Sequence, residues 1–190
     1  MSAFEAKIFS EFPSSSELPR RNEVIDDVEM KKGCKEIVRN FYGNELDKKY
    51  ADEGLIVRYQ LVDQFYNSVK ECMGIDAEIT FVEKSPYNLG GYSPKKNLIE
   101  LNRNYLEKAD CGELLNTILH ESRHAFQKKC IDNPDSVTVK NNVIEVWKDN
   151  SDNYISPCYD FEAYENQEVE KDANYFADSI MKEYENLNYA

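Results

Sequence analysis

Long apolar runs, paired cysteines and an excess of positive charge are all missing from this sequence. No segment approaches the roughly 20 apolar residues that a membrane-spanning helix needs, and residues 1–22 contain no apolar stretch of signal-peptide length. The five cysteines form no C-x-x-C pair, which argues against a zinc ribbon or a dithiol redox site. Their odd number and wide spacing favour free thiols in a reducing compartment. We therefore expect a cytoplasmic protein, although export by a route without such a signal would leave the same pattern.

Basic residues are outnumbered, 23 against 36 acidic ones, which gives a formal net charge of −13. A field of that sign repels phosphate groups, so we expect neither nucleic acid nor an anionic membrane as a partner. Hydrophobic residues make up 41% of the 190 residues, enough apolar material to fold into one domain. We expect a single domain over residues 23–190. A mobile N-terminal arm is expected over residues 1–22, where EFPSSSELPRRN combines prolines, serines and charges.

The spacing of apolar residues predicts the secondary structure in outline. Helical spacing predicts helices over residues 24–41, 55–72, 113–130 and 162–184, the second of them ending at Met73-Gly74. Alternation predicts strands over 77–83 and 97–102, with the turn-rich SPYNLGGYSPKKN between them. Residues 131–160 predict a long loop with a short strand at VIEVW, 143–147.

Histidine is scarce, and the chain's two histidines both fall within LLNTILHESRHAFQ, residues 114–127. His120, Glu121 and His124 there spell H-E-x-x-H. In a shuffled chain of this composition the pattern would arise in on the order of one case in a thousand. Its neighbours are the apolar residues of a buried helix rather than the charges of a solvated one. We therefore interpret the pair as metal ligands rather than as two surface imidazoles.

The motif suits a catalytic metal because of where a helix places its residues. Residues four apart lie on one face about one turn from each other, so both imidazoles can bind one ion. With a third protein ligand, a tetrahedral zinc site keeps one position for water, whose pKa the metal lowers to about 7. Glu121 would take the proton of that water as general base and pass it to the leaving amine. The motif thus predicts a zinc-dependent peptidase acting on a protein or peptide substrate, although Ni²⁺, Co²⁺ or Fe²⁺ would suit similar ligands.

The chain has no third histidine that could serve as the third ligand. We therefore expect a carboxylate in that place or, less readily, a cysteine or water. Acidic residues are too common for composition to choose among them. In the C-terminal helix, ENQEVEKDANYFAD contains Glu170, Ala173 and Asn174 in the order E-x-x-A-N. Nearby glutamates remain rivals for the same role: Glu162, Glu165 and Glu168.

These two motifs resemble those of the gluzincin-type zincin metallopeptidases, a group that includes thermolysin-like enzymes and ImmA/IrrE-type proteins. The resemblance covers roughly residues 90–180, and DANYFA is similar to a run of the ImmA/IrrE type. It implies that Glu170 is the third zinc ligand, that Ala173 lets the two helices approach, and that Asn174 orients a zinc-binding imidazole. The fold it implies is α+β and zincin-like, with a small, mostly antiparallel sheet beside the motif helix.

The resemblance also implies a role for the strand NLIELN. In such enzymes an edge strand above the cleft pairs with the substrate backbone. Gly90 and Gly91 just upstream either allow a close backbone approach or simply form a turn. Any of three tyrosines between the ligand helices could hydrogen-bond the developing oxyanion: Tyr154, Tyr159 and Tyr164.

Two other functions fit the same residues. One is a zincin-like metal-binding domain that recognises a partner without turnover, and the other is a peptidase toxin or effector from a mobile element. Glu121 favours an enzyme, because a purely structural zinc site needs no general base and usually has four protein ligands.

Overall fold

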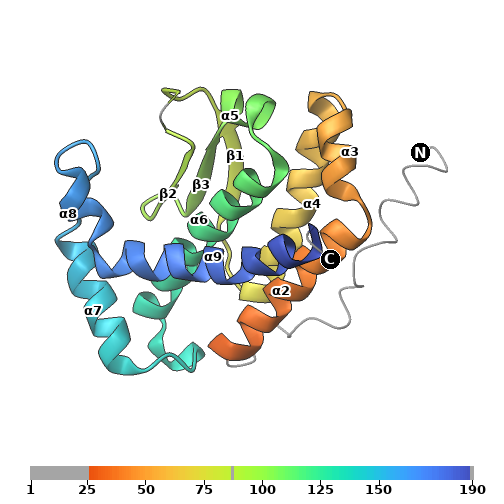
Figure 1. The fold of residues 1–190 in the computed structure, drawn as a ribbon. Helices are drawn as coiled ribbons and strands as arrows, with labels where there is room; N and C mark the ends of the chain where they lie inside the picture. Colours follow the sequence, from red (N-terminus) through yellow and green to blue (C-terminus); the bar gives the residue numbers. More distant parts are fainter. Residues whose placement is uncertain (1–25, 87, 189–190) are drawn as a thin grey trace.

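The computed structural model describes residues 26–86 and 88–188, which fold as helices around a small sheet (Figure 1). This α+β fold agrees with the expected class, and buried side chains from α2 to α9 form one hydrophobic core. The expected N-terminal arm, residues 1–22, lies outside the described residues. The helices are α2 (Asp27–Gly43), α3 (Leu46–Asp52), α4 (Leu55–Met73), α5 (Arg103–Lys108), α6 (Cys111–Asp132), α7 (Asn141–Asp152), α8 (Phe161–Glu165) and α9 (Glu168–Asn188), with a 3-10 turn at Pro134–Ser136.

Capping residues set the limits of the main helices. Asp110 accepts a hydrogen bond from the backbone N–H of Glu113 and so begins α6, the helix that carries the histidine motif. Asp26 caps α2 in the same way, through the N–H groups of Val28 and Glu29. Gly74 ends α4 with a left-handed backbone, φ 59°, as the sequence predicted.

The sheet has three strands, β1 (Glu78–Val82), β2 (Gly90–Ser93) and β3 (Leu98–Asn102), in the order β1-β3-β2. β1 pairs with β3 in parallel, and β2 pairs with β3 antiparallel, so the sheet is mixed rather than mostly antiparallel. NLIELN was expected at an edge and instead forms the central strand, whose backbone pairs on both sides. The edge next to α6 belongs to β2, which lies inside the segment predicted to be a turn-rich loop.

Two predictions for the C-terminal half were wrong. The expected strand VIEVW lies within helix α7, where Ile144 and Trp147 are buried and Val146 is exposed, as helical spacing requires. The helix predicted over 162–184 is broken after Glu165 into α8 and α9. At the break lies Gln167, whose buried amide accepts from the N–H of Ile155 at 2.7 Å and donates to its carbonyl at 2.9 Å. This pairing holds the preceding loop against the start of α9.

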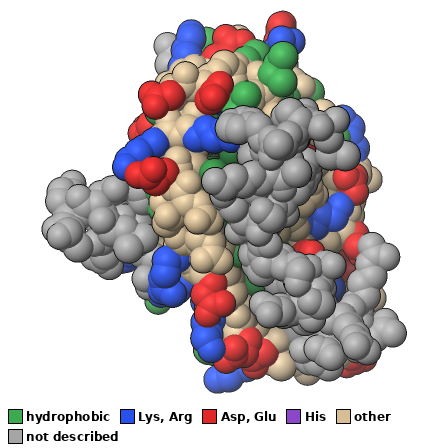
Figure 2. Space-filling view, turned by 90° about the vertical axis from the view of Figure 1, so that its right-hand side faces the viewer, with side chains coloured by type: hydrophobic (Ala, Val, Ile, Leu, Met, Phe, Trp, Pro, Cys, Tyr) green, Lys and Arg blue, Asp and Glu red, His purple; other side chains and the backbone are tan. Residues whose placement is uncertain are grey.

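Helix α9 crosses α6 and also packs against α2, so the first and last of the described helices lie side by side (Figure 1). α7 and α8 lie at the N-terminal end of α9, beside the motif. On the side built from α2, α3 and α4, acidic and basic side chains are mixed among the residues that Figure 2 colours. Among the described helices, none combines the length and apolar character needed to cross a membrane.

Candidate metal centre

Three side chains from two helices converge where α9 crosses α6. Nε2 of His120 and Nε2 of His124 are 3.0 Å apart, and their rings stand nearly perpendicular, at 83°. The Glu170 carboxylate spans them, with Oε2 3.4 Å from His120 Nε2 and Oε1 3.4 Å from His124 Nε2. One potential ligand atom from each residue thus lies within 4.8 Å of the others. The structure brings together the three residues that the sequence offered as metal ligands.

This arrangement has the chemistry of a cation site. Glu170 is 1% exposed, and its Oε2 has no hydrogen-bond partner among the described residues. A buried carboxylate oxygen without a donor is costly unless a cation satisfies it. Two imidazole nitrogens and one carboxylate oxygen match the ligands of catalytic zinc. The rival carboxylates all lie on the exposed surface: Glu162, Glu165 and Glu168.

The carboxylate and the imidazole at the site stabilise each other's charged forms. Burial alone would raise the pKa of Glu170, but its contacts with His120 and His124 hold that pKa well below its usual range. Burial opposes the charged form of His124, yet Glu170 and the nearby Glu121 raise the pKa of this imidazole to about 9. His124 and Glu170 therefore form a buried ion pair between an imidazolium and a carboxylate.

Glu121, the expected general base, lies on the same side of α6 as the cluster. It is 8% exposed. Burial and Glu170 raise the pKa of Tyr154 and Tyr164 most, and the charge of Glu121 adds to the rise in both. Within the described part of the chain it forms no ion pair, so its carboxylate is available to accept a proton.

The three candidate tyrosines differ sharply in position. The Tyr154 hydroxyl donates a 2.8 Å hydrogen bond to Glu170 Oε1. Tyr164 packs edge-on against Tyr154, with ring centroids 6.2 Å apart, and burial and Glu170 both raise its pKa. Tyr159 is 91% exposed. Two of the three expected residues therefore border the site, and the third points into solvent.

The residue that contacts the imidazole from behind is Gln127, which sequence reasoning missed. Gln127 Oε1 lies 2.9 Å from Nδ1 of His124. Asn174, expected in this role, is exposed, and among the described contacts it makes none with either histidine. Ala173 is fully buried, consistent with its expected place between the helices. Gln127 follows His124 by three residues, a helical neighbour that the spacing alone could have revealed.

A groove begins one helical turn before the cluster. Asn116 and Thr117 of α6 line it and precede His120 and Glu121 by a turn. Its remaining lining comes from the start of α6, from α5, from α9 and from the chain just before β2: Leu89, Tyr105, Gly112, Glu113 and Met181. Gly90 at the start of β2 lies so close to α6 that an added Cβ would stand 3.3 Å from Thr117 Cγ2. The close-approach interpretation of Gly90 is therefore correct, whereas an added Cβ at Gly91 would meet nothing within 4 Å.

No protein-family model, curated protein or solved structure matches the chain. The functional interpretation consequently depends on the chemistry of these residues.

Proposed function

We propose that this chain is a zinc-dependent peptidase of the zincin type, with His120, His124 and Glu170 as zinc ligands and Glu121 as general base. One observation carries the proposal: a buried carboxylate lies between two imidazole nitrogens, and one of its oxygens has no donor among the described residues. Glu121, beside it, forms no ion pair within the same residues. Both imidazoles keep some solvent exposure, 14% and 15% of their side chains, as an open catalytic site requires.

Different residues of the chain would have different roles in hydrolysis. Zinc, when bound, would supply a Lewis acid that lowers the pKa of water and polarises the scissile carbonyl. Glu121 would accept a proton from the attacking water and deliver it to the leaving nitrogen. Tyr154 would hold the Glu170 carboxylate through its 2.8 Å hydrogen bond, and Tyr164 would exclude water from that side.

A peptide would find backbone partners beside the cluster. β2 has one edge paired with β3 and the other without a strand partner among the described residues. An extended peptide can add to such an edge by main-chain hydrogen bonds while its side chains enter neighbouring recesses. The groove along α6 offers such a recess one turn from Glu121.

Replacing the general base distinguishes this function from metal-dependent recognition of a partner. The Glu121→Gln variant should bind one zinc per chain as the parent does, yet cleave a peptide library at least about 100-fold more slowly, since general bases contribute that much or more. Glu162→Gln, an exposed change of the same kind, serves as the control and should cleave normally.

Cleavage retained in Glu121→Gln would rule out this residue as the base. A zinc-loaded parent that cleaves no peptide, while a captured partner binds both forms equally, would instead favour recognition without turnover. A parent chain that takes up no zinc would overturn the proposal at its first step.

A further inference from the structure

Gln127 is buried to 2% exposure on α6, and all the hydrogen-bonding atoms of its side chain are engaged. Its Nε2 donates to the carbonyl oxygen of Val169 at 2.9 Å and to Oδ2 of Asp172 at 2.9 Å. Its Oε1 faces Nδ1 of His124 at 2.9 Å. One amide therefore joins the imidazole to two acceptors on α9.

These partners fix the position of one proton. A carbonyl and a carboxylate can only accept, so the amide group must turn its two N–H donors toward them. Its oxygen is then left facing His124 and can itself only accept. Nδ1 of His124 must therefore carry the hydrogen, whichever charge state the ring has. In the neutral ring, Nε2 then keeps its lone pair, directed at His120 and Glu170.

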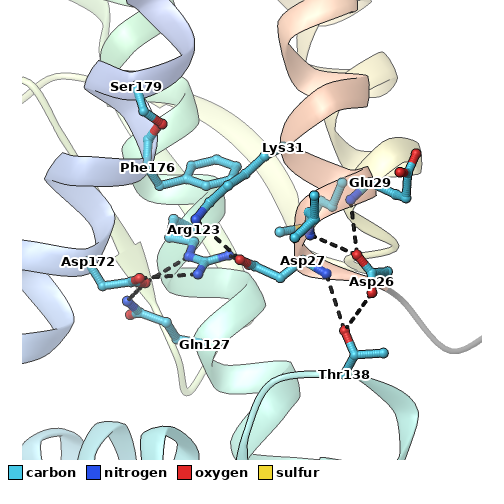
Figure 3. A network of polar contacts seen from close by, with 12 residues as sticks. Asp26, Asp27, Glu29, Lys31, Arg123, Gln127, Thr138, Asp172, Phe176 and Ser179 are labelled. Carbon is cyan, nitrogen blue, oxygen red and sulfur yellow. Dashed lines mark hydrogen bonds and ion pairs between the residues drawn. The ribbon is translucent and has the colours of Figure 1, made fainter.

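The orientation of the amide depends in turn on Asp172, which a buried arginine holds in place. Arg123 donates to both carboxylate oxygens of Asp172, from Nε at 2.7 Å and from Nη2 at 3.1 Å. Its Nη1 donates to Asp27 of α2 at 2.6 Å (Figure 3). The guanidinium is 4.8 to 5.3 Å from the centres of three aromatic rings, those of Phe126, Trp147 and Phe176. These contacts hold the planar guanidinium of Arg123 in place. The Asp172 carboxylate, which it binds through two hydrogen bonds, therefore has little freedom to rotate.

We propose that Gln127 is a positioning residue that keeps the hydrogen of His124 on Nδ1 and so presents Nε2 to a metal, while the Arg123–Asp172 pair keeps the Gln127 amide in the required orientation. The inference rests on the proposed metal site but goes beyond it, because it assigns roles to residues outside the ligand set and the H-E-x-x-H signature positions. It also gives a role to one of the two unspecified positions of that signature, because Arg123 is the residue directly before His124.

The substitution Gln127→Met removes the acceptor while keeping a similar volume, and Gln64→Met on α4 is its matched control. Gln64 is partly buried, and its Oε1 has no partner among the described residues. Asp172→Asn provides a second variant, because the –NH2 group placed there faces donors of Arg123 in either orientation, and the Gln127 donor as well in one of them. Melting temperature and circular dichroism verify that each variant is folded.

Two measurements test the proposal. At about pH 10, above the pKa of about 9 of His124, the ring is neutral, and ¹⁵N NMR of the parent without metal should show its one hydrogen on Nδ1. Gln64→Met should retain this tautomer and Gln127→Met should lose it. Zinc affinity, measured by competition with a chelating dye, should fall about 10- to 100-fold in Gln127→Met and Asp172→Asn and stay unchanged in Gln64→Met.

A parent that binds zinc while Gln127→Met binds it equally well would overturn this inference and leave the proposed metal site intact. A His124 ring without hydrogen on Nδ1 would overturn it too. If the parent shows the protected Nδ1–H but takes up no zinc, the positioning by Gln127 stands and the proposed function fails.

Discussion

Glu170 is the residue on which the candidate site depends most, because a charge with 1% exposure must have a cation close by. Without metal, that cation is the imidazolium of His124, whose raised pKa keeps it protonated at neutral pH. With metal, the ion would replace the proton. The same carboxylate therefore explains both the ion pair with His124 and why the cluster would favour a divalent cation.

Substituting Tyr154 tests how much the Glu170 carboxylate depends on the hydrogen bond from the Tyr154 hydroxyl. We expect Tyr154→Phe to weaken zinc binding about 10-fold, because it removes the hydrogen bond that holds Glu170 Oε1 and support of this kind around a metal ligand contributes 10- to 100-fold. Competition with a chelating dye measures the change.

Tyr159→Phe is the matched control, since that side chain is 91% exposed and should leave the zinc affinity unaltered. If Tyr154→Phe binds zinc as tightly as the parent but cleaves peptides more slowly, the hydroxyl acts on the substrate instead.

The clustering of the three candidate ligands was predictable from sequence at this scale, whereas the residues that support them were only partly so. H-E-x-x-H fixes three positions by helical geometry alone, and E-x-x-A-N pointed to a second helix. Asn174 was the wrong partner for the imidazole, because the supporting bond comes from within α6 and not from α9. Arg123 carried no sequence signal, since its partners Asp27 and Asp172 come from helices far away in the chain.

At the element scale, α6 and α4 followed from local rules, and α7 did not. Asp110 and Gly74 supply caps that any sequence reading can find. VIEVW is a short apolar run, which periodicity assigns equally well to a buried strand or to a helix. Its helical form is decided by tertiary packing, in which Trp147 lies against Arg123. The break before α9 likewise depends on a long-range contact, that of Gln167 with Ile155.

The placement of β2 against the motif helix yields a prediction of its own. Gly90→Ala should destabilise the fold by about 1–2 kcal/mol, because the new Cβ would stand 2.9 Å from Leu101 Cδ2 and 3.3 Å from Thr117 Cγ2, and overpacking costs that much. Urea unfolding measures the free energy.

Gly91→Ala makes the same chemical change one residue later, where nothing lies within 4 Å, and should shift the free energy of unfolding by less than about 0.5 kcal/mol. Equal effects of the two substitutions would mean that Gly90 is not packed against Leu101 and Thr117 as described.

For the molecule as a whole, a proton and the proposed metal would compete for the point where α6 and α9 cross. In the metal-free protein the pKa of His124 is raised from its ordinary 6.5 to about 9. The ion pair therefore contributes its full stability below pH 6.5 and loses it as pH rises through 9. Zinc has the opposite preference, since it requires the neutral imidazole and must displace that proton.

Zinc should consequently raise the melting temperature more at pH 8 than at pH 6. Displacing one proton from a group with a pKa of about 9 makes the apparent affinity rise about tenfold per pH unit, or about 100-fold over this interval. At saturating, buffered zinc this corresponds to about 2.7 kcal/mol, or about 5–10 °C for a chain of this size. Differential scanning fluorimetry with and without zinc measures it, and His124→Ala, which lacks the competing imidazole, should lose most of the response at both pH values. An equal or larger gain at pH 6 would show that zinc does not bind through His124.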